Sequence, residues 1–238
     1  MGRTIVAGGC LNPKAPCPYD PVFANNAWSD IIAACQTNNI PETWVVGDSK
    51  AMTINGVSYN IDIIGKHHDA YSDGSGVAPL TFQTHELLPD KYAMISTSDT
   101  QNSKWEISRM RTETLPNILT TLPTEVQNAI REVSKTSKQG SGGLVQTTDK
   151  LFLLSSWEVF GSNSSVSSTN ADGTQYEYYV SGNSVIKSNL EGTACIWWTR
   201  TGTYGDQKYS YYVVTKSGTE STSYSYSALT YISFAFCF

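Results

Sequence analysis

The chain has 238 residues, of which 39% are hydrophobic and 16% are charged, and its formal net charge is −5. A chain of this length buries roughly 70% of its unfolded surface on folding, so it does not need a disulfide scaffold. The acidic balance and the absence of Lys or Arg runs exclude the electrostatic footprint of a nucleic-acid-binding protein. Ser, Thr, Asn, Gly and Tyr take the place of charged residues, which is typical of a β-rich protein with a neutral polar surface.

No segment of the sequence predicts membrane insertion or export. The first ten residues, "MGRTIVAGGC", lack the apolar h-region of a signal peptide. No stretch approaches the roughly 18 apolar residues that a membrane-spanning helix requires. We therefore expect no membrane-inserted segment and no signal peptide in this sequence.

The five cysteines do not predict a zinc site, because no C-x-x-C pair occurs among them. Cys10 and Cys17 flank "LNPKAP" and could form a disulfide in an oxidising compartment or remain free. Cys35, Cys195 and Cys237 lie among apolar neighbours, so we expect small buried hydrophobic side chains.

The N-terminal part divides into an irregular arm, residues 1–25, and the start of a single domain, residues 26–238. Four prolines within the first 26 residues exclude regular helix and central strand there. Asn26 could then cap a short amphipathic helix, whose apolar residues recur at helical spacing. These are Trp28, Ile31, Ile32 and Cys35.

Two strands and a helical region follow. The Asn55–Gly56 dipeptide between two β-branched runs is a strong hairpin signal and predicts strands at about 44–54 and 57–66. Helical spacing predicts helix from 104 to 133 with a break near Pro116. Thr124 and Gln127 match a capping box for a second helix after Pro123, with Val126, Ile130 and Val133 as its apolar stripe.

The second half is predicted to consist mainly of strands and turns. We expect a flexible loop at 134–143, a strongly apolar strand within 149–161 and a polar loop at 162–173. Further strands are predicted at 175–180, 195–201, 209–216 before a turn at Ser217 and Gly218, and 231–238. The order of elements indicates an α+β fold with an antiparallel sheet in the second half.

Five short motifs together resemble an uncharacterised domain family of gut bacteria and phages that has a C-type lectin-like fold, related to the formylglycine-generating enzyme. The motifs are "WVVGD" at 44–48, "IDIIGKHHD" at 61–69, "WEISRMR" at 105–111, "TDKLFLLS" with "EVFG" at 148–161, and "WTRT" at 198–201. The resemblance covers residues 26–238. The family commonly ends in "GVRPAFCL", whereas this chain ends in "YISFAFCF" and keeps only Ala235, Phe236 and Cys237 of that motif.

The resemblance implies a C-terminal ligand face, which in some relatives is varied by diversity-generating retroelements. Seven of the chain's 14 tyrosines lie after residue 199, in a field of Ser and Thr. Antibody paratopes use the same residue types, because Tyr gives rigid contact area and Ser adapts to its partner. The alternative is that Tyr and Thr follow β-propensity on a solvated sheet face. The residues that the first interpretation assigns to ligand binding are Thr199, Thr201, Thr203, Tyr204, Asp206, Gln207, Tyr209, Tyr211, Ser223, Tyr224, Tyr226 and Tyr231.

Catalytic and metal-binding interpretations are weaker. His67, His68 and His85 lie near Asp62, Asp69 and Glu86, but neighbouring residues of an extended segment face opposite sides. We expect His68 and Asp69 to fix the loop after a strand through hydrogen bonds, with a metal site or a catalytic base as the alternatives.

Neither a hydrolase nor an oxidase is predicted. No nucleophile elbow is present, and Cys195 and Cys237 do not match the copper-binding cysteine pair of formylglycine-generating enzymes. We therefore expect no metal and no cofactor.

The charged side chains of the helical region and of the last motif are interpreted as structural. Glu106, Arg109, Arg111 and Glu113 are typical of a solvated, ion-paired helix face. Arg200 lies in an aromatic strand, where a buried carboxylate or backbone carbonyls would anchor it.

The sequence and the resemblance together indicate a non-enzymatic binding module displayed on a phage tail or a bacterial surface. Its expected partner is a protein or glycan on a host or neighbouring cell, without nucleic acid. A homo-oligomer, a trimer for a tail-tip protein, stays open. The alternatives are an enzyme on a formylglycine-generating-enzyme-like scaffold and a structural virion subunit.

Overall fold

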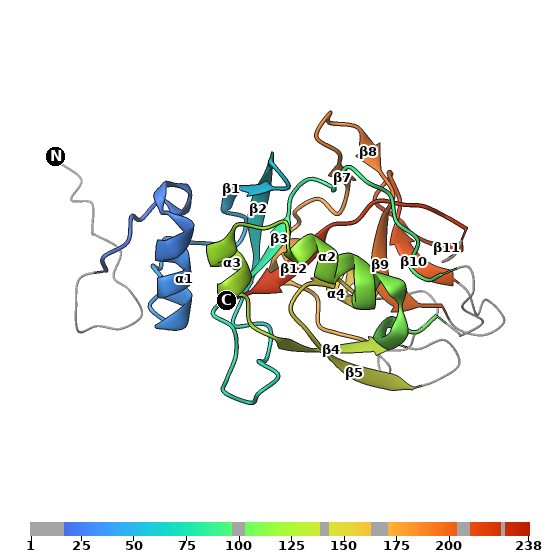
Figure 1. Ribbon diagram of the computed structural model, residues 1–238, viewed down its shortest axis with the longest axis horizontal. Coiled ribbons are helices and arrows are strands. Elements are labelled where there is room, and N and C mark those ends of the chain that lie inside the picture. Colours follow the sequence, from blue (N-terminus) through green and yellow to red (C-terminus); the bar gives the residue numbers. More distant parts are fainter. Residues whose placement is uncertain (1–16, 97–102, 139–142, 163–170, 204–209, 225–226) are drawn as a thin grey trace.

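A computed structural model of the chain describes residues 17–96, 103–138, 143–162, 171–203, 210–224 and 227–238, without the side chain of Tyr224. Its helices are η1 (Phe23–Asn25), α1 (Trp28–Gln36), η2 (Trp105–Ile107), η3 (Met110–Thr114), α2 (Leu115–Leu119), α3 (Thr124–Ala129), α4 (Ser156–Phe160) and α5 (Glu177–Val180). Its strands are β1 (Ser49–Ile54), β2 (Val57–Lys66), β3 (Leu80–Thr84), β4 (Val133–Lys138), β5 (Leu144–Asp149), β6 (Phe152–Leu153), β7 (Lys187–Ser188), β8 (Ala194–Cys195), β9 (Trp197–Gly202), β10 (Ser210–Val214), β11 (Glu220–Tyr224) and β12 (Phe234–Cys237). The predicted α+β class with antiparallel sheets is confirmed (Figure 1).

A five-stranded sheet in the order β1-β2-β3-β12-β6 joins the two halves of the chain. The last strand, β12, pairs with β3 on one side and with β6 on the other. A second sheet has the order β11-β10-β9, in which β9 and β10 correspond to the predicted strands at 195–201 and 209–216 and β11 was not predicted. The pairs β4–β5 and β7–β8 form separate hairpins. In Figure 1 the β4–β5 hairpin crosses below α4 and β12.

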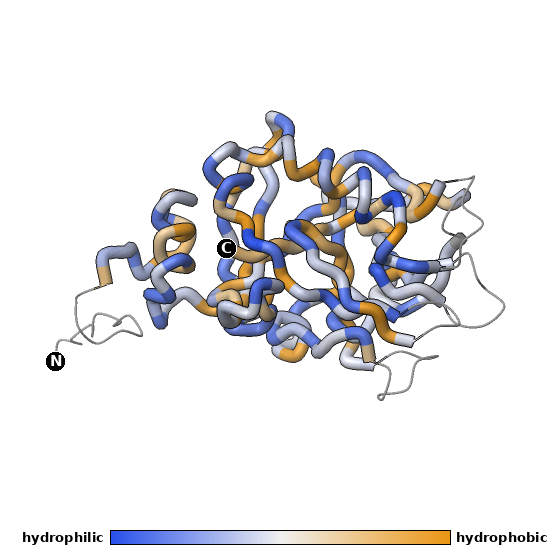
Figure 2. The backbone as a smooth tube through the Cα atoms, turned by 60° about the horizontal axis from the view of Figure 1, so that its bottom comes forward, coloured by the Kyte–Doolittle hydropathy of each residue, from blue (hydrophilic) through white to orange (hydrophobic). Residues whose placement is uncertain are grey.

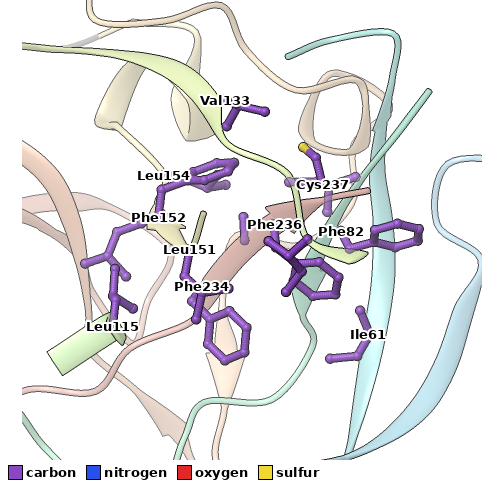
Figure 3. Close-up of a cluster of buried hydrophobic side chains, with 14 of the residues drawn as sticks. Ile61, Phe82, Leu115, Val133, Leu151, Phe152, Leu154, Phe234, Phe236 and Cys237 are labelled. Atoms are coloured by element: carbon purple, nitrogen blue, oxygen red, sulfur yellow. The ribbon is translucent and has the colours of Figure 1, made fainter. Parts of the chain in front are cut away.

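The core lies around β3, β6 and β12. Phe82, Phe234 and Phe236 are fully buried, and Phe236 stacks on Phe82 with ring centroids 5.3 Å apart. Figure 3 shows the three rings in one cluster that also holds Phe152 and Leu154. The predicted buried strand at the end of the chain is therefore confirmed.

The predicted Asn-Gly hairpin is also confirmed. Asn55 and Gly56 have φ of 48° and 77°, the left-handed values that a two-residue type I′ turn requires, and β2 has its predicted bounds. The first strand starts at Ser49 rather than near 44. Gly47 has φ of 98° in a turn that the Asp48 side chain closes on the Val45 amide, so strand geometry cannot begin earlier.

The first predicted helix is confirmed as α1, and its four expected apolar residues are buried. It begins after Ala27 instead of Asn26. Asp30 accepts a hydrogen bond from the Ala27 amide at 3.1 Å, whereas the Asn26 side chain turns back and donates to carbonyls of the preceding turn.

The region 104–133 differs from the prediction in three places. The break expected near Pro116 is instead a π-helical turn, η3, that runs into α2 and accommodates a proline without an amide donor. The Thr124–Gln127 capping box is wrong, because Pro123 is the N-cap residue and Gln127 donates to the Leu122 carbonyl. Val133 starts strand β4 and does not belong to the helix.

Three predictions in the second half are wrong. Residues 133–138 pair with 144–149 as a hairpin, so the part of the predicted flexible loop that is described is strand. The apolar run at 149–161 is a two-residue strand followed by helix α4. The segment at 175–180 contains helix α5 instead of a strand. The last two are short apolar runs, for which periodicity does not separate helix from strand. The first is polar and has no apolar alternation that would mark a strand.

Within the part of the chain that the structure describes, no helix has the length and apolar character that crossing a membrane requires. Figure 2 shows apolar segments that are short and interrupted by hydrophilic ones.

The close approach between β9 and the segment before η2 predicts a strict requirement for glycine at 202. A Cβ on Gly202 would collide with the backbone carbonyl of Ser103, whereas a Cβ on Gly143 would meet nothing within 4 Å. Gly202→Ala should lower the free energy of unfolding by about 1–3 kcal/mol, the usual cost of overpacking. Urea denaturation of both variants measures this, and equal stability of Gly202→Ala and Gly143→Ala would contradict it.

Candidate functional site

A chain of buried charges crosses the interior between the two sheets. Lys135 Nζ lies 2.7 Å from Asp69 Oδ1 and 2.6 Å from Glu158 Oε1, and Arg200 Nη1 lies 2.5 Å from Glu158 Oε2. No side chain of the four is more than 4% exposed. We call these residues the charge chain, in which two carboxylates alternate with two cations.

Arg200 on β9 forms one end of the charge chain. Its guanidinium donates to both oxygens of Glu158 and to the carbonyls of residues 136, 153 and 172. Every nitrogen of the fork has an acceptor, as a buried guanidinium requires. The prediction that a carboxylate and backbone carbonyls anchor Arg200 is confirmed.

Glu158 reaches this position because it belongs to the N-terminal cap of α4. Ser155 Oγ accepts from the Glu158 amide, and Glu158 Oε2 accepts from the Ser155 amide, both at 3.0 Å. Gly161 ends the helix in the left-handed conformation, with φ of 69°. The same carboxylate thus caps the helix and pairs with two cations.

Asp69 closes the other end of the charge chain. Its carboxylate accepts from Thr81 Oγ1 at 2.5 Å, from Lys135 and from the Tyr176 hydroxyl at 2.9 Å. The Tyr176 ring stacks on His68 with centroids 3.9 Å apart. Asp69 therefore fixes the segment after β2 through hydrogen bonds, as predicted, whereas His68 packs there by ring stacking and not by the predicted hydrogen bond.

The charge chain holds each group in its ordinary ionised form. Burial raises the pKa of Asp69, but Lys135 and the hydrogen bonds outweigh it and hold the pKa at about 2. Burial likewise opposes ionisation of Glu158 and Lys135, yet their partners lower the pKa of Glu158 and raise that of Lys135. None of the three is poised to exchange a proton near neutral pH.

Asp172 lies beside the charge chain, but its pKa is raised, whereas the pKa values of Asp69 and Glu158 are lowered. Burial raises the pKa of Asp172, and although Oδ2 accepts from Thr201 Oγ1 at 2.7 Å, Oδ1 has no hydrogen-bond partner among the described residues. Cys237 Sγ lies 3.7 Å from Asp69 Oδ2. Burial raises the pKa of the Cys237 thiol, so the thiol stays protonated.

An open cavity of about 680 Å³ lies over the Asp69–Lys135–Glu158 part of the charge chain. Its volume falls in the range of small-molecule sites. Around these three residues it is lined by His67, His68, Ala70, Ser134, Thr136, Leu144, Gln146, Ala171, Gly173 and Thr174.

The side chains at the cavity rim have unused hydrogen-bonding capacity. We define the polar rim as His67, His68, Ser134, Thr136, Gln146 and Thr174. Within the described ranges, none of these side chains forms a hydrogen bond with another residue, whereas the charge chain below is fully paired. These side chains can therefore bind a ligand without first breaking a hydrogen bond to another described residue.

The third histidine, His85, lies apart from this cavity. Its Nδ1 is 2.7 Å from Asp62 Oδ2, and this hydrogen bond raises the pKa of His85. Among the described residues no group of three His, Cys, Asp or Glu side chains could hold a metal ion.

Four residues assigned to ligand binding are buried, which corrects that assignment. Thr199 Oγ1 donates to the Tyr212 carbonyl, Thr201 Oγ1 donates to Asp172, and Thr203 Oγ1 donates to the Ser210 carbonyl. Tyr211 is fully buried and packs edge-on against Trp198. Their hydroxyls and rings hold β9 and β10 in place and do not face solvent.

The other assigned residues keep their interpretation as a prediction. Ser223 and Tyr231 are half-buried, and the Lys91 ammonium lies 5.0 Å from the centroid of the Tyr231 ring. Tyr224 ends strand β11, but its side chain is not described. Tyr204, Asp206, Gln207, Tyr209 and Tyr226 lie outside the described residues.

The predictions for the cysteines are confirmed in part. Cys17 is disulfide-bonded, while Cys10, its proposed partner, lies outside the described residues. Cys35 and Cys237 are buried as predicted, whereas Cys195 is only half-buried.

The predicted ion-paired helix face is confirmed for one pair only. Arg109 and Glu113 form it, 3.0 Å apart. Arg111 instead pairs with the buried Asp149, at 2.5 Å.

Sequence reasoning missed Lys135, Glu158 and Tyr176 because their segments were predicted as loop and strands. One signal could have found Glu158: Ser155 three residues before it and Gly161 three residues after it mark a capped single-turn helix.

The structure defines the class of this protein. It is an antiparallel α+β domain with a polar cavity over a charge chain whose charges are paired with one another. Residues 84–237, more than half of the chain, match the model of a family described as Domain of unknown function (DUF6273), and the chain belongs to that family. No curated protein and no solved structure matches the chain.

The charge chain predicts a large cost for removing its central carboxylate. Glu158→Gln removes the carboxylate that pairs with Arg200 and one of the two that pair with Lys135, and it should destabilise the fold by about 3–5 kcal/mol. The matched control is Glu113→Gln, which breaks an exposed pair and should cost less than about 1 kcal/mol. Chemical denaturation compares the two, and similar losses would show that the buried chain carries no special weight.

The lowered pKa of Asp69 predicts an acid limit to stability. The folded pKa of about 2 lies below the ordinary 3.8, so the stabilisation is complete above about pH 4 and is lost as the pH falls toward 2. Thr81→Val removes a hydrogen bond that lowers this pKa and should shift the midpoint of the Asp69 titration upward. Carbon-detected NMR of the carboxyl group measures the midpoint, and an unchanged value would contradict the assignment.

Proposed function

We propose that the chain is a non-enzymatic ligand-binding module of C-type lectin-like type that binds its ligand in the cavity over the charge chain. The observation that carries this proposal is a contrast between two sets of side chains. Those of the polar rim form no hydrogen bond with another described residue, whereas every charge of the charge chain is paired. A rim of this kind provides directional contacts, and a rigid floor keeps them in place.

The ionisation states favour binding over catalysis. A general acid or base works best when its pKa lies near the operating pH. In the floor of the cavity the carboxylates have lowered pKa values and the lysine a raised one. Tyr176 and Cys237 stay protonated because burial raises their pKa values. The floor thus supplies a fixed electrostatic surface and no proton-transfer group.

The edge strand β11 offers a second contact surface within the same proposal. Ser221 and Thr222 are exposed. Among the described strands β11 pairs with β10 alone, so its other edge has no strand partner there. Together with the tyrosine-rich composition this supports a recognition face for a protein or glycan on a host or neighbouring cell. Display on a phage tail or a bacterial surface belongs to this proposal.

The test compares substitutions in the two surfaces. Labelled protein is applied to an array of bacterial surface glycans and to a displayed peptide library. Ser134→Ala/Gln146→Ala should lose at least about tenfold in affinity for the selected probe, equivalent to about 1.4 kcal/mol. The melting temperature should not change, because neither side chain forms a hydrogen bond with another described residue.

Thr148→Ala is the matched control, since Thr148 is exposed two residues from Gln146 on the same strand and does not line the cavity. It should leave binding unchanged. Equal affinity of wild type and double variant would refute the cavity as the site, and loss on Ser221→Ala/Ser223→Ala instead would move the site to β11.

A further inference from the structure

A second cavity of about 360 Å³ lies on the other side of the segment after β2. It is lined by Cys35, Gln36, Asn38, His67, Tyr71, Ser75, Gly76, Val77, Pro79 and Arg131. His67 borders both this cavity and the first one. The two hollows therefore adjoin each other at one side chain.

The backbone places His67 at this junction. His67 has φ of 49°, a left-handed value that is uncommon for a residue with a side chain, and its amide donates to the Pro79 carbonyl at 3.2 Å. Its imidazole is exposed and makes no hydrogen bond within the described part of the chain. Strained backbone of this kind persists where the surrounding structure enforces it, and it is concentrated at binding sites.

The second cavity has the same chemical character as the first. The Arg131 guanidinium lies over the Tyr71 ring at 3.6 Å from its centroid, and its charge is paired with Asp73 at 2.7 Å. The exposed side chains of Gln36 and Asn38 form no hydrogen bond with any other described residue. Asn38, like His67, has φ of 49°. Both cavities thus present amides, hydroxyls and imidazole, and their charges are paired internally.

We infer that the two cavities are subsites of one groove for a linear, uncharged oligosaccharide that crosses His67. This inference rests on the proposed function. A charged ligand would lose hydration without gaining an unpaired counter-charge. Sugar hydroxyls can instead pair with the free hydroxyls of the first cavity and with the free amides on both sides. A peptide would instead require strand pairing or apolar side-chain pockets, and the free groups of this groove are polar.

We expect the ligand to be an oligosaccharide and not a monosaccharide, because polar side chains without hydrogen bonds to other described residues line both cavities, on either side of His67. Linking two units that each fill one subsite makes the second binding event intramolecular, so affinity grows with length until both subsites are filled. A substitution in the second cavity then affects long ligands only.

The test uses cellulose-, chitin- and xylan-derived oligosaccharides from the monosaccharide to the hexasaccharide, with calorimetry on the full chain. At least one series should gain about tenfold or more in affinity between the monosaccharide and the longer members. Gln146→Ala should weaken every member. Asn38→Gly, which suits the left-handed backbone, should weaken only the longer members, and His67→Gly should remove most of the gain with length.

Affinity that stops increasing at the monosaccharide, or equal sensitivity of short and long ligands to Asn38→Gly, would overturn the two-subsite groove. Failure of all three series to bind would overturn the oligosaccharide assignment. In either case a peptide or other array probe that Ser134→Ala/Gln146→Ala abolishes would leave the proposed function standing. Thr148→Ala serves again as the control.

Discussion

The ion pairs between Arg200, Glu158, Lys135 and Asp69 join four segments that no single sheet connects: β9, α4, β4 and the segment after β2. Buried ion pairs add little net stability, because desolvation offsets their attraction, but an unpaired member is costly. The four segments must therefore come together as a unit, and no one of them can move without exposing an unpaired charge. This constraint makes the floor of the cavity rigid, and it explains why a six-residue strand and a single-turn helix can hold a defined site.

The sequence predicted the elements whose signals are local. The Asn55–Gly56 turn, helix α1 and the buried final strand each depend on a turn dipeptide, a helical period or a run of apolar residues, and all three are present. The anchoring of Arg200 was also predictable, since a guanidinium within an aromatic strand needs acceptors. The segments that carry Lys135, Glu158 and Tyr176 could not be assigned in the same way. They are short, and their conformation depends on ion pairs with residues far along the chain.

The buried threonines of β9 show why composition misled the interpretation of the C-terminal region. Alternating Thr199, Thr201 and Thr203 suggest a hydroxyl surface, yet all of β9 is buried, and each hydroxyl bonds a carbonyl or a carboxylate inside the protein. A hydroxyl serves equally well in water and in the interior once it has a partner. The residue type alone therefore cannot distinguish display from internal bonding, because the difference lies in tertiary contacts.

The contrast between the ion-paired floor of the cavity and its polar rim also determines which residues can be substituted without loss of stability. Ser134 and Thr136 flank Lys135 on the same strand, so one strand supplies both a fixed charge on its inner face and free hydroxyls at the rim. Substituting a rim side chain removes no hydrogen bond to another described residue, whereas substituting Lys135 leaves Asp69 in the interior without its cation and Glu158 with Arg200 alone. Binding specificity can thus change by rim substitutions at little cost in stability, while the charge chain keeps the fold and the shape of the cavity constant.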